Sequence, residues 1–196
     1  LQAQAQVLAA RPDLPLVSSM WTWLPSSTDP ARTDFSGPPL DAAAVQVLPG
    51  WDSILRDPYL CTPTVVVDAA AARACGGFDI TLPSAEDIDF FLRIVDGQPY
   101  GLVKQALAGC QLRPGSLTQT ENSHVHNLNV LRRLAEVRRE VLLNHAPALQ
   151  AARLDIYLRW ARSQLFWGKG SGARRILQES RQFGQVPGFR YLWIKS

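Results

Sequence analysis

Hydrophobic and polar residues alternate along the first part of the chain in a way that predicts helices and strands in turn. Residues 1–10 are rich in Ala, Gln and Leu, and we expect a helix that ends at Pro12, which cannot continue the hydrogen-bond ladder. Residues 16–24 are bulky, apolar and flanked by prolines, which favours a buried strand. The proline-rich residues 25–50 are typical of a loop.

The middle of the chain continues this pattern. Residues 51–55 fit a short helical turn, and the β-branched run at residues 62–67 predicts a buried strand. Asp68 is then expected to cap a short helix over residues 69–74, which stops at a glycine pair.

Downstream of that pair, an acidic helix is expected over residues 86–96 and ends at Gly97. Residues 100–103 and 106–112 predict two further strand segments.

After Glu121 the pattern becomes helical only. Apolar residues recur there at steps of three and four, which predicts an amphipathic helix: Leu128, Leu131, Leu134, Val137 and Val141. Pro147 is well placed to begin a second helix, and Ser171 to cap a third over residues 172–182. We therefore expect an α/β domain over residues 1–121 and an all-helical extension over residues 122–196.

Composition and charge agree with two different regions. A hydrophobic content of 46% with 19% charged residues is typical of a globular protein. Residues 1–121 hold 7 basic and 13 acidic residues, a net −6, whereas residues 122–196 hold 13 and 4, a net +9. Such asymmetry indicates regions with separate roles.

Several cellular settings are disfavoured. No apolar run approaches the roughly 18 residues that a membrane span needs, and residues 1–6 do not resemble a signal peptide. Three widely spaced cysteines, Cys61, Cys75 and Cys110, are expected to be reduced thiols. We expect a cytoplasmic protein, and the absence of an initiator Met suggests a fragment.

The candidate chemistry lies around the glycine pair Gly76-Gly77. Ten residues later, Glu86, Asp87 and Asp89 place three carboxylates at a predicted helix start. Acidic residues complement the exposed N–H groups of a first helical turn, but this explains one or two of them. The cluster therefore indicates a reaction centre, with helix capping as the alternative.

The order of these motifs resembles the inverting family-2 glycosyltransferases of the GT-A fold. A β-branched strand and a short helix precede Gly76-Gly77-Phe78-Asp79, and E-D-x-D-x-x-x-R follows from Glu86 to Arg93. The likeness extends back to residues 1–12, similar to the helix after the family's metal-binding D-x-D, and forward to Pro114-Gly115-Ser116. It implies a partial GT-A (nucleotide-diphospho-sugar transferase) sheet, the acceptor-side half, over residues 1–121.

The resemblance implies roles for individual residues. Asp87 would be the general base and Glu86 would orient the site or bind the acceptor. Gly76 and Gly77 would leave room for the acceptor, and Asp79 would either bind substrate or bond to the loop backbone. Arg113 replaces a histidine found in many relatives and can pair with a diphosphate through its fork of donors.

The resemblance also implies a cofactor and partners. The intact enzyme would use a divalent cation, Mg2+ or Mn2+, whose D-x-D ligands lie in the nucleotide-binding half that this chain lacks. Asp87-Ile88-Asp89 has that spelling but belongs to the other motif, so no metal ligand is assigned here. The partners would be a nucleotide-sugar donor and a glycan or other hydroxyl acceptor, and the fragment alone is expected to be inactive.

Other polar and aromatic residues are expected to be structural. Asp89 and Arg93 are four apart and can pair along a helix. Phe78 is predicted to be core. We expect the three tryptophans Trp21, Trp23 and Trp51 to pack in the protein rather than stack on a sugar. We expect His124 and His126 to lie on a solvated surface rather than bind a metal.

The basic helices leave a second function open. Their arginines are expected to form a solvated face, although they could also contact an anionic glycan or the inner membrane face. No recognition motif supports nucleic-acid binding. The alternative to an enzyme is a non-catalytic module whose basic helices bind a partner or an anionic membrane surface.

Overall fold

A computed structural model describes residues 2–29, 32–35, 45–56, 60–111, 121–139 and 143–184. The chain divides into two compact units, Leu1–Thr81 with Glu86–Ser116, and Leu82–Ala85 with Leu117–Ser196. The first unit combines a mixed sheet with helices, and the second consists of helices, so the chain is of the α/β class.

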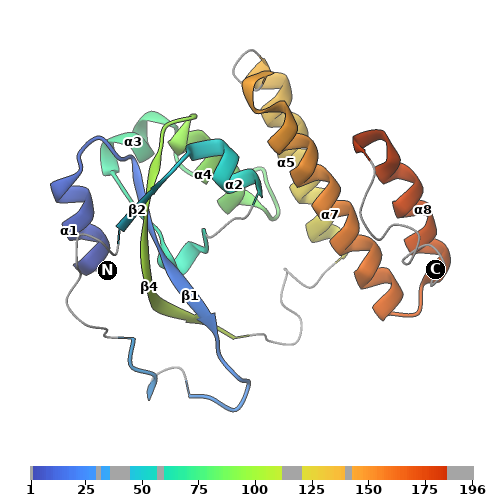
Figure 1. Ribbon diagram of the computed structural model, residues 1–196, viewed down its shortest axis with the longest axis horizontal. Helices are drawn as coiled ribbons and strands as arrows, with labels where there is room; N and C mark the ends of the chain where they lie inside the picture. The colour runs from blue at the N-terminus through green and yellow to red at the C-terminus, as the bar shows by residue number, and fades with distance from the viewer. Residues whose placement is uncertain are drawn as a thin grey trace. The chain divides into compact units, whose positions relative to one another are not determined.

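The sheet of the first unit has four strands in the order β2-β4-β1-β3 (Figure 1). Its strands are β1 Leu16–Trp23, β2 Val45–Leu48, β3 Val66–Val67 and β4 Tyr100–Cys110. The central pair, β1 and β4, runs parallel, whereas β2 and β3 are antiparallel to their neighbours. Ser18 and Ser19 are buried in β1, and Ser18 Oγ lies 3.0 Å from Thr64 Oγ1.

One loop prediction and one strand prediction were wrong in their limits. β2 lies within the residues expected to be loop, because its pairing with β4 supplies hydrogen bonds that no local pattern signals. The two expected final segments are one strand, β4, whose register with β1 jumps from Val103 to Ala106 between neighbouring residues of β1. The irregularity accommodates Lys104 and Gln105 without ending the strand.

The predicted strand over residues 62–67 was also too long. Thr62–Thr64 forms a 3-10 helix, and only Val66–Val67 pairs, as β3. Pro63 has no N–H to give to a strand ladder, and its fixed φ suits the first turn of a helix. The Thr64 hydroxyl donates to the carbonyl of Cys61 at 2.7 Å and holds this turn.

Four helices of the first unit confirm the predictions: α1 Gln2–Ala10, α2 Gly50–Arg56, α3 Ala69–Ala74 and α4 Glu86–Val95. Figure 1 shows α1 on one side of the sheet and α2 with α4 on the other. Val7 of α1 packs with Val17 and Val103 of the central strands. Trp51 of α2 is fully buried, and its Nε1 donates to Leu92 O at 2.8 Å, so its predicted packing role is confirmed.

The second unit contains the helices α5 Glu121–Val137, α7 Ala146–Phe166 and α8 Gly170–Ser180, with short 3-10 turns at Leu143–His145 and Arg181–Phe183. Helix α7 packs against both α5 and α8. Ser171 was predicted to cap α8 but lies inside it, because the helix begins at Gly170 and its N-cap is Lys169. None of the helices in the described ranges combines the length and apolar character that crossing a bilayer requires.

Candidate functional site

The glycine pair ends helix α3 in a Schellman motif. Gly77 N donates to Ala72 O at 3.0 Å and Gly76 N donates to Arg73 O at 3.1 Å. Gly76 has φ 83° and Gly77 has φ 70°. A Cβ at either position would meet no atom within 4 Å, so the left-handed backbone, and not crowding, requires glycine.

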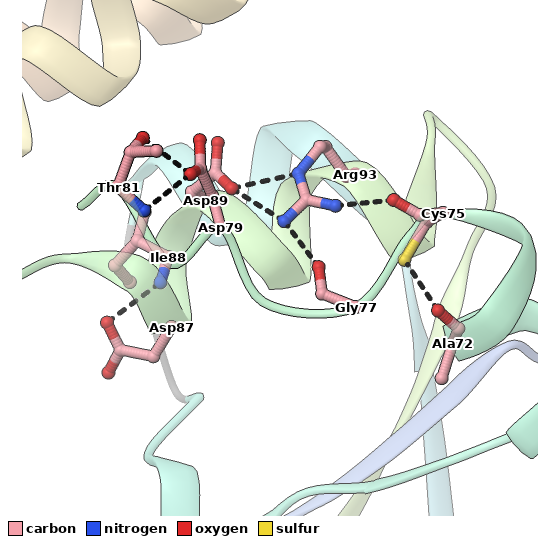
Figure 2. Close-up of polar contacts among 9 residues, drawn as sticks. All are labelled: Ala72, Cys75, Gly77, Asp79, Thr81, Asp87, Ile88, Asp89 and Arg93. Carbon is pink, nitrogen blue, oxygen red and sulfur yellow. Dashed lines mark hydrogen bonds and ion pairs between the residues drawn. The ribbon is translucent and has the colours of Figure 1, made fainter.

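Arg93 ties this loop to helix α4. Its Nε donates to Asp89 Oδ2 at 2.8 Å, which confirms the predicted pair along the helix. The same guanidinium donates to Cys75 O at 2.6 Å through Nη1 and to Gly77 O at 2.8 Å through Nη2 (Figure 2). Arg93 therefore connects the two halves of the motif through backbone carbonyls at and just beyond the C-terminal end of α3.

Asp79 and Phe78 complete the loop. Asp79 Oδ1 accepts from Thr81 N at 2.9 Å and from Thr81 Oγ1 at 2.6 Å, and the bond to the loop backbone is one of the two roles expected of this residue. Phe78 was predicted to be core but is 47% exposed. Its ring packs on Phe90 with centroids 4.3 Å apart, so the side chain covers the core from outside.

The start of α4 has an unusual backbone. Ala85, the residue before the helix, has φ 63, which costs a residue with a Cβ about 1–3 kcal/mol. Glu86 follows as an exposed side chain, and Asp87 is half-buried. Asp87 Oδ1 accepts from Ile88 N at 2.8 Å, and Figure 2 shows the carboxylate turned away from the Asp89–Arg93 pair.

The second oxygen of Asp87 faces the turn before β3. Asp87 Oδ2 accepts from Thr62 Oγ1 at 3.2 Å. The preceding residue, Cys61, places its sulfur 3.4 Å from that of Cys110 at the end of β4. A carboxylate, a hydroxyl and two thiols thus gather at the carboxyl end of the parallel strand pair, where ligands bind in open α/β sheets.

Trp23 is the aromatic residue at this end of the sheet, and sequence reasoning set it aside as packing. It is the register partner of Cys110, and its side chain is 59% exposed. Its ring stands nearly perpendicular to that of Trp21, at 87° and 4.8 Å between centroids. The only signal in the sequence was its place near the end of a predicted strand.

The two histidines were wrongly expected on a solvated surface. Both are half-buried in the second unit. His126 Nδ1 lies 2.5 Å from Ser84 Oγ, and the His124 ring stacks on Trp160 with centroids 6.2 Å apart.

Two further expectations concern Arg113 and the cation. Arg113 lies outside the described residues. Within the described ranges, no group of three His, Cys, Asp or Glu side chains comes together to hold a metal ion. The ligands of the expected Mg2+ or Mn2+ were predicted to lie in the nucleotide-binding half, outside this chain.

No family model, curated protein or solved structure matches the chain.

Proposed function

We propose that the first unit is the acceptor-side half of an inverting glycosyltransferase of the family-2 type, with a GT-A sheet and Asp87 as general base. The supporting observation is the hydrogen bond from Thr62 Oγ1 to Asp87 Oδ2, a hydroxyl held on the carboxylate at 3.2 Å. A general base must be within this reach of the proton that it removes. An acceptor hydroxyl can use the free lone pairs of the same carboxylate.

The reaction proposed is a single displacement. The acceptor oxygen attacks the anomeric carbon of the nucleotide-sugar while its proton passes to the Asp87 carboxylate. The bond between the anomeric carbon and the diphosphate breaks, and the nucleoside diphosphate leaves with the electron pair. Glu86 is exposed beside the base, and its carboxylate would accept a hydrogen bond from a second hydroxyl group of the sugar acceptor.

Three further residues, Gly76, Gly77 and Trp23, support this proposal. Gly76 and Gly77 leave open space beside the loop. Trp23 offers an exposed ring at the same end of the sheet, suited to one face of a sugar. Asp79 is engaged with Thr81, which favours a loop-holding role over substrate contact.

Product stereochemistry tests the proposal. The full-length protein that contains this chain is incubated with nucleotide-sugars of defined anomeric configuration and hydroxyl acceptors. Proton NMR then reads the configuration of the new glycosidic bond. Inversion is expected; a retained configuration, or no transfer from any nucleotide-sugar, would remove Asp87 from its proposed role.

A cavity in the second unit favours a second candidate, a binding module for an anionic surface. The cavity has a volume of about 520 Å3 and is lined by both aromatic and basic side chains. Arg153 and Trp160 lie in its wall, and burial lowers the pKa of Arg153. Trp160 Nε1 is buried without a hydrogen-bond partner in the part of the chain that the structure describes.

Vesicle binding distinguishes this candidate. Binding to phosphatidylglycerol vesicles, absent with phosphatidylcholine and lost in Arg153→Gln, would support it. Arg159→Gln is the matched control, because Arg159 pairs with Asp155 at 2.8 Å on the same helix. Equal loss in both variants would indicate only general charge attraction.

A further inference from the structure

Cys61 and Cys110 stand 49 residues apart in the sequence, yet their Sγ atoms lie 3.4 Å from each other. Both are free thiols and both are half-buried. The third cysteine, Cys75, is also half-buried, but its thiol donates to Ala72 O at 3.3 Å (Figure 2). The chain therefore holds one thiol pair and one matched single thiol.

The backbone on each side of the pair is held in place. Cys61 O accepts from Thr64 N and from Thr64 Oγ1, both at 2.7 Å. Cys110 is in register with Trp23, and its O accepts from Leu24 N at 2.8 Å. A disulfide has a bond of about 2.05 Å, so the sulfur atoms must approach by roughly 1.4 Å, within the range of side-chain rotation.

We propose that Cys61 and Cys110 form a redox modification site that closes reversibly to a disulfide by exchange with a low-molecular-weight disulfide. The Cys110 thiolate attacks one sulfur of the reagent, whose S–S bond breaks and releases a thiolate. Once the Cys110 sulfur is bonded to the reagent, Cys61 gives up its proton to solvent, and its thiolate attacks Sγ of Cys110 in the mixed disulfide. This attack displaces the second reagent thiolate, which takes up a proton. The protein thiols lose two protons and two electrons, and both reagent sulfurs leave as thiols.

The surroundings fix this order of events. Burial, the hydrogen bond with Cys110 and the nearby Asp87 carboxylate together raise the pKa of Cys61 to about 12. Cys61 therefore holds its proton more tightly than an ordinary thiol, and either sulfur of the pair can donate in the hydrogen bond between them. Cys110 is the thiol that reacts first, because the thiolate is the nucleophile in exchange.

A disulfide between Cys61 and Cys110 would form close to Asp87, the candidate base. Thr62 follows Cys61 and donates to Asp87 Oδ2, so closure places the new disulfide one residue from that hydrogen bond. This consequence rests on the proposed function, whereas closure itself does not.

Peptide mapping tests closure without any activity assay. Reduced full-length protein is treated with oxidised glutathione near pH ~8, where thiol exchange is rapid, and free thiols are then blocked with N-ethylmaleimide. Mass spectrometry of proteolytic peptides is expected to find a Cys61–Cys110 disulfide that dithiothreitol removes. In Cys61→Ser the reaction should stop at a stable glutathione adduct on Cys110.

The matched control is Cys75→Ser, which should close at the rate of the parent protein. Persistent glutathione on Cys110 in the parent protein would overturn the proposal, as would a disulfide to Cys75. Unmodified Cys61 and Cys110 under conditions that modify Cys75 would also overturn it. If closure occurs but the full-length protein transfers no sugar, the modification site stands and the proposed function fails.

Discussion

Arg93 donates at 2.8 Å to the carbonyl oxygen of Gly77, 16 residues earlier in the chain, and thereby connects the glycine loop to the acidic helix. The same side chain pairs with Asp89 and bonds to Cys75 O. The spacing between the two motif halves is thus a structural requirement as well as a feature of the candidate site.

The first prediction concerns this connection. Arg93→Lys keeps the positive charge but cannot reach three acceptors with a planar fork, so we expect unfolding to become easier by about 1–3 kcal/mol. Urea unfolding followed by circular dichroism measures the change. Arg159→Lys is the control: Arg159 also pairs with an aspartate four residues away but is 53% exposed, and should cost under about 0.5 kcal/mol. Equal losses of stability in the two variants would mean that the hydrogen bonds from Arg93 to the loop carbonyls do not stabilise the protein.

The second prediction concerns the backbone before α4. Ala85 has φ 63, a conformation that glycine adopts without penalty. Ala85→Gly should therefore stabilise the protein by about 0.5–1 kcal/mol, even after the entropy cost of glycine. In α3, Ala72→Gly should destabilise it by about 0.5–1 kcal/mol. Thermal unfolding of both variants checks the opposite signs, and destabilisation by Ala85→Gly would contradict the assigned backbone.

The third prediction is a pH dependence caused by Cys61. Its pKa rises in the folded protein from the ordinary 9.0 to about 12, so the folded state holds its proton more tightly. The resulting stability is fully present below pH 9 and is lost as the pH rises toward 12. Under reducing conditions, the free energy of unfolding of the parent protein should therefore fall relative to that of Cys61→Ser as the pH rises from 9 toward 12. A constant difference would contradict the raised pKa.

The fourth prediction concerns Trp23. Its ring is mostly exposed, so Trp23→Ala should change stability by less than about 0.5 kcal/mol. If the ring contacts the acceptor sugar, the variant should lose about 1–2 kcal/mol of acceptor binding, seen as a KM raised about tenfold. Phe166→Ala removes another exposed aromatic ring, from the helical unit, and should leave KM unchanged. Unchanged KM in Trp23→Ala would remove this residue from the site.

Local patterns were sufficient for the helices of the first unit and for their ends. The Asp68 cap, the glycine stop after α3 and the Asp89–Arg93 pair all involve residues at most a few positions apart. β2 was missed because it is defined by pairing with β4, more than 50 residues away.

The same distinction holds at the candidate site. The hydrogen bond from Thr62 to Asp87 joins residues 25 positions apart, and the contact between Cys61 and Cys110 joins residues 49 positions apart. No periodicity encodes such contacts. The exposure of Phe78 could not be predicted either, because the sequence next to a glycine pair has no periodicity that separates buried from exposed positions.

The most direct test of the account is sugar transfer by Asp87→Asn in the full-length protein. Asparagine keeps one oxygen to accept the hydrogen bond from Ile88 N, and its amide nitrogen can donate to Thr62 Oγ1, but the side chain cannot take a proton. We expect kcat to fall by roughly 100-fold or more with donor binding unchanged, since general-base catalysis contributes about 10²–10⁴-fold. Asp68→Asn, another aspartate at a helix start, should transfer normally because asparagine caps a helix as well. Transfer by Asp87→Asn at the rate of Asp68→Asn would contradict the account.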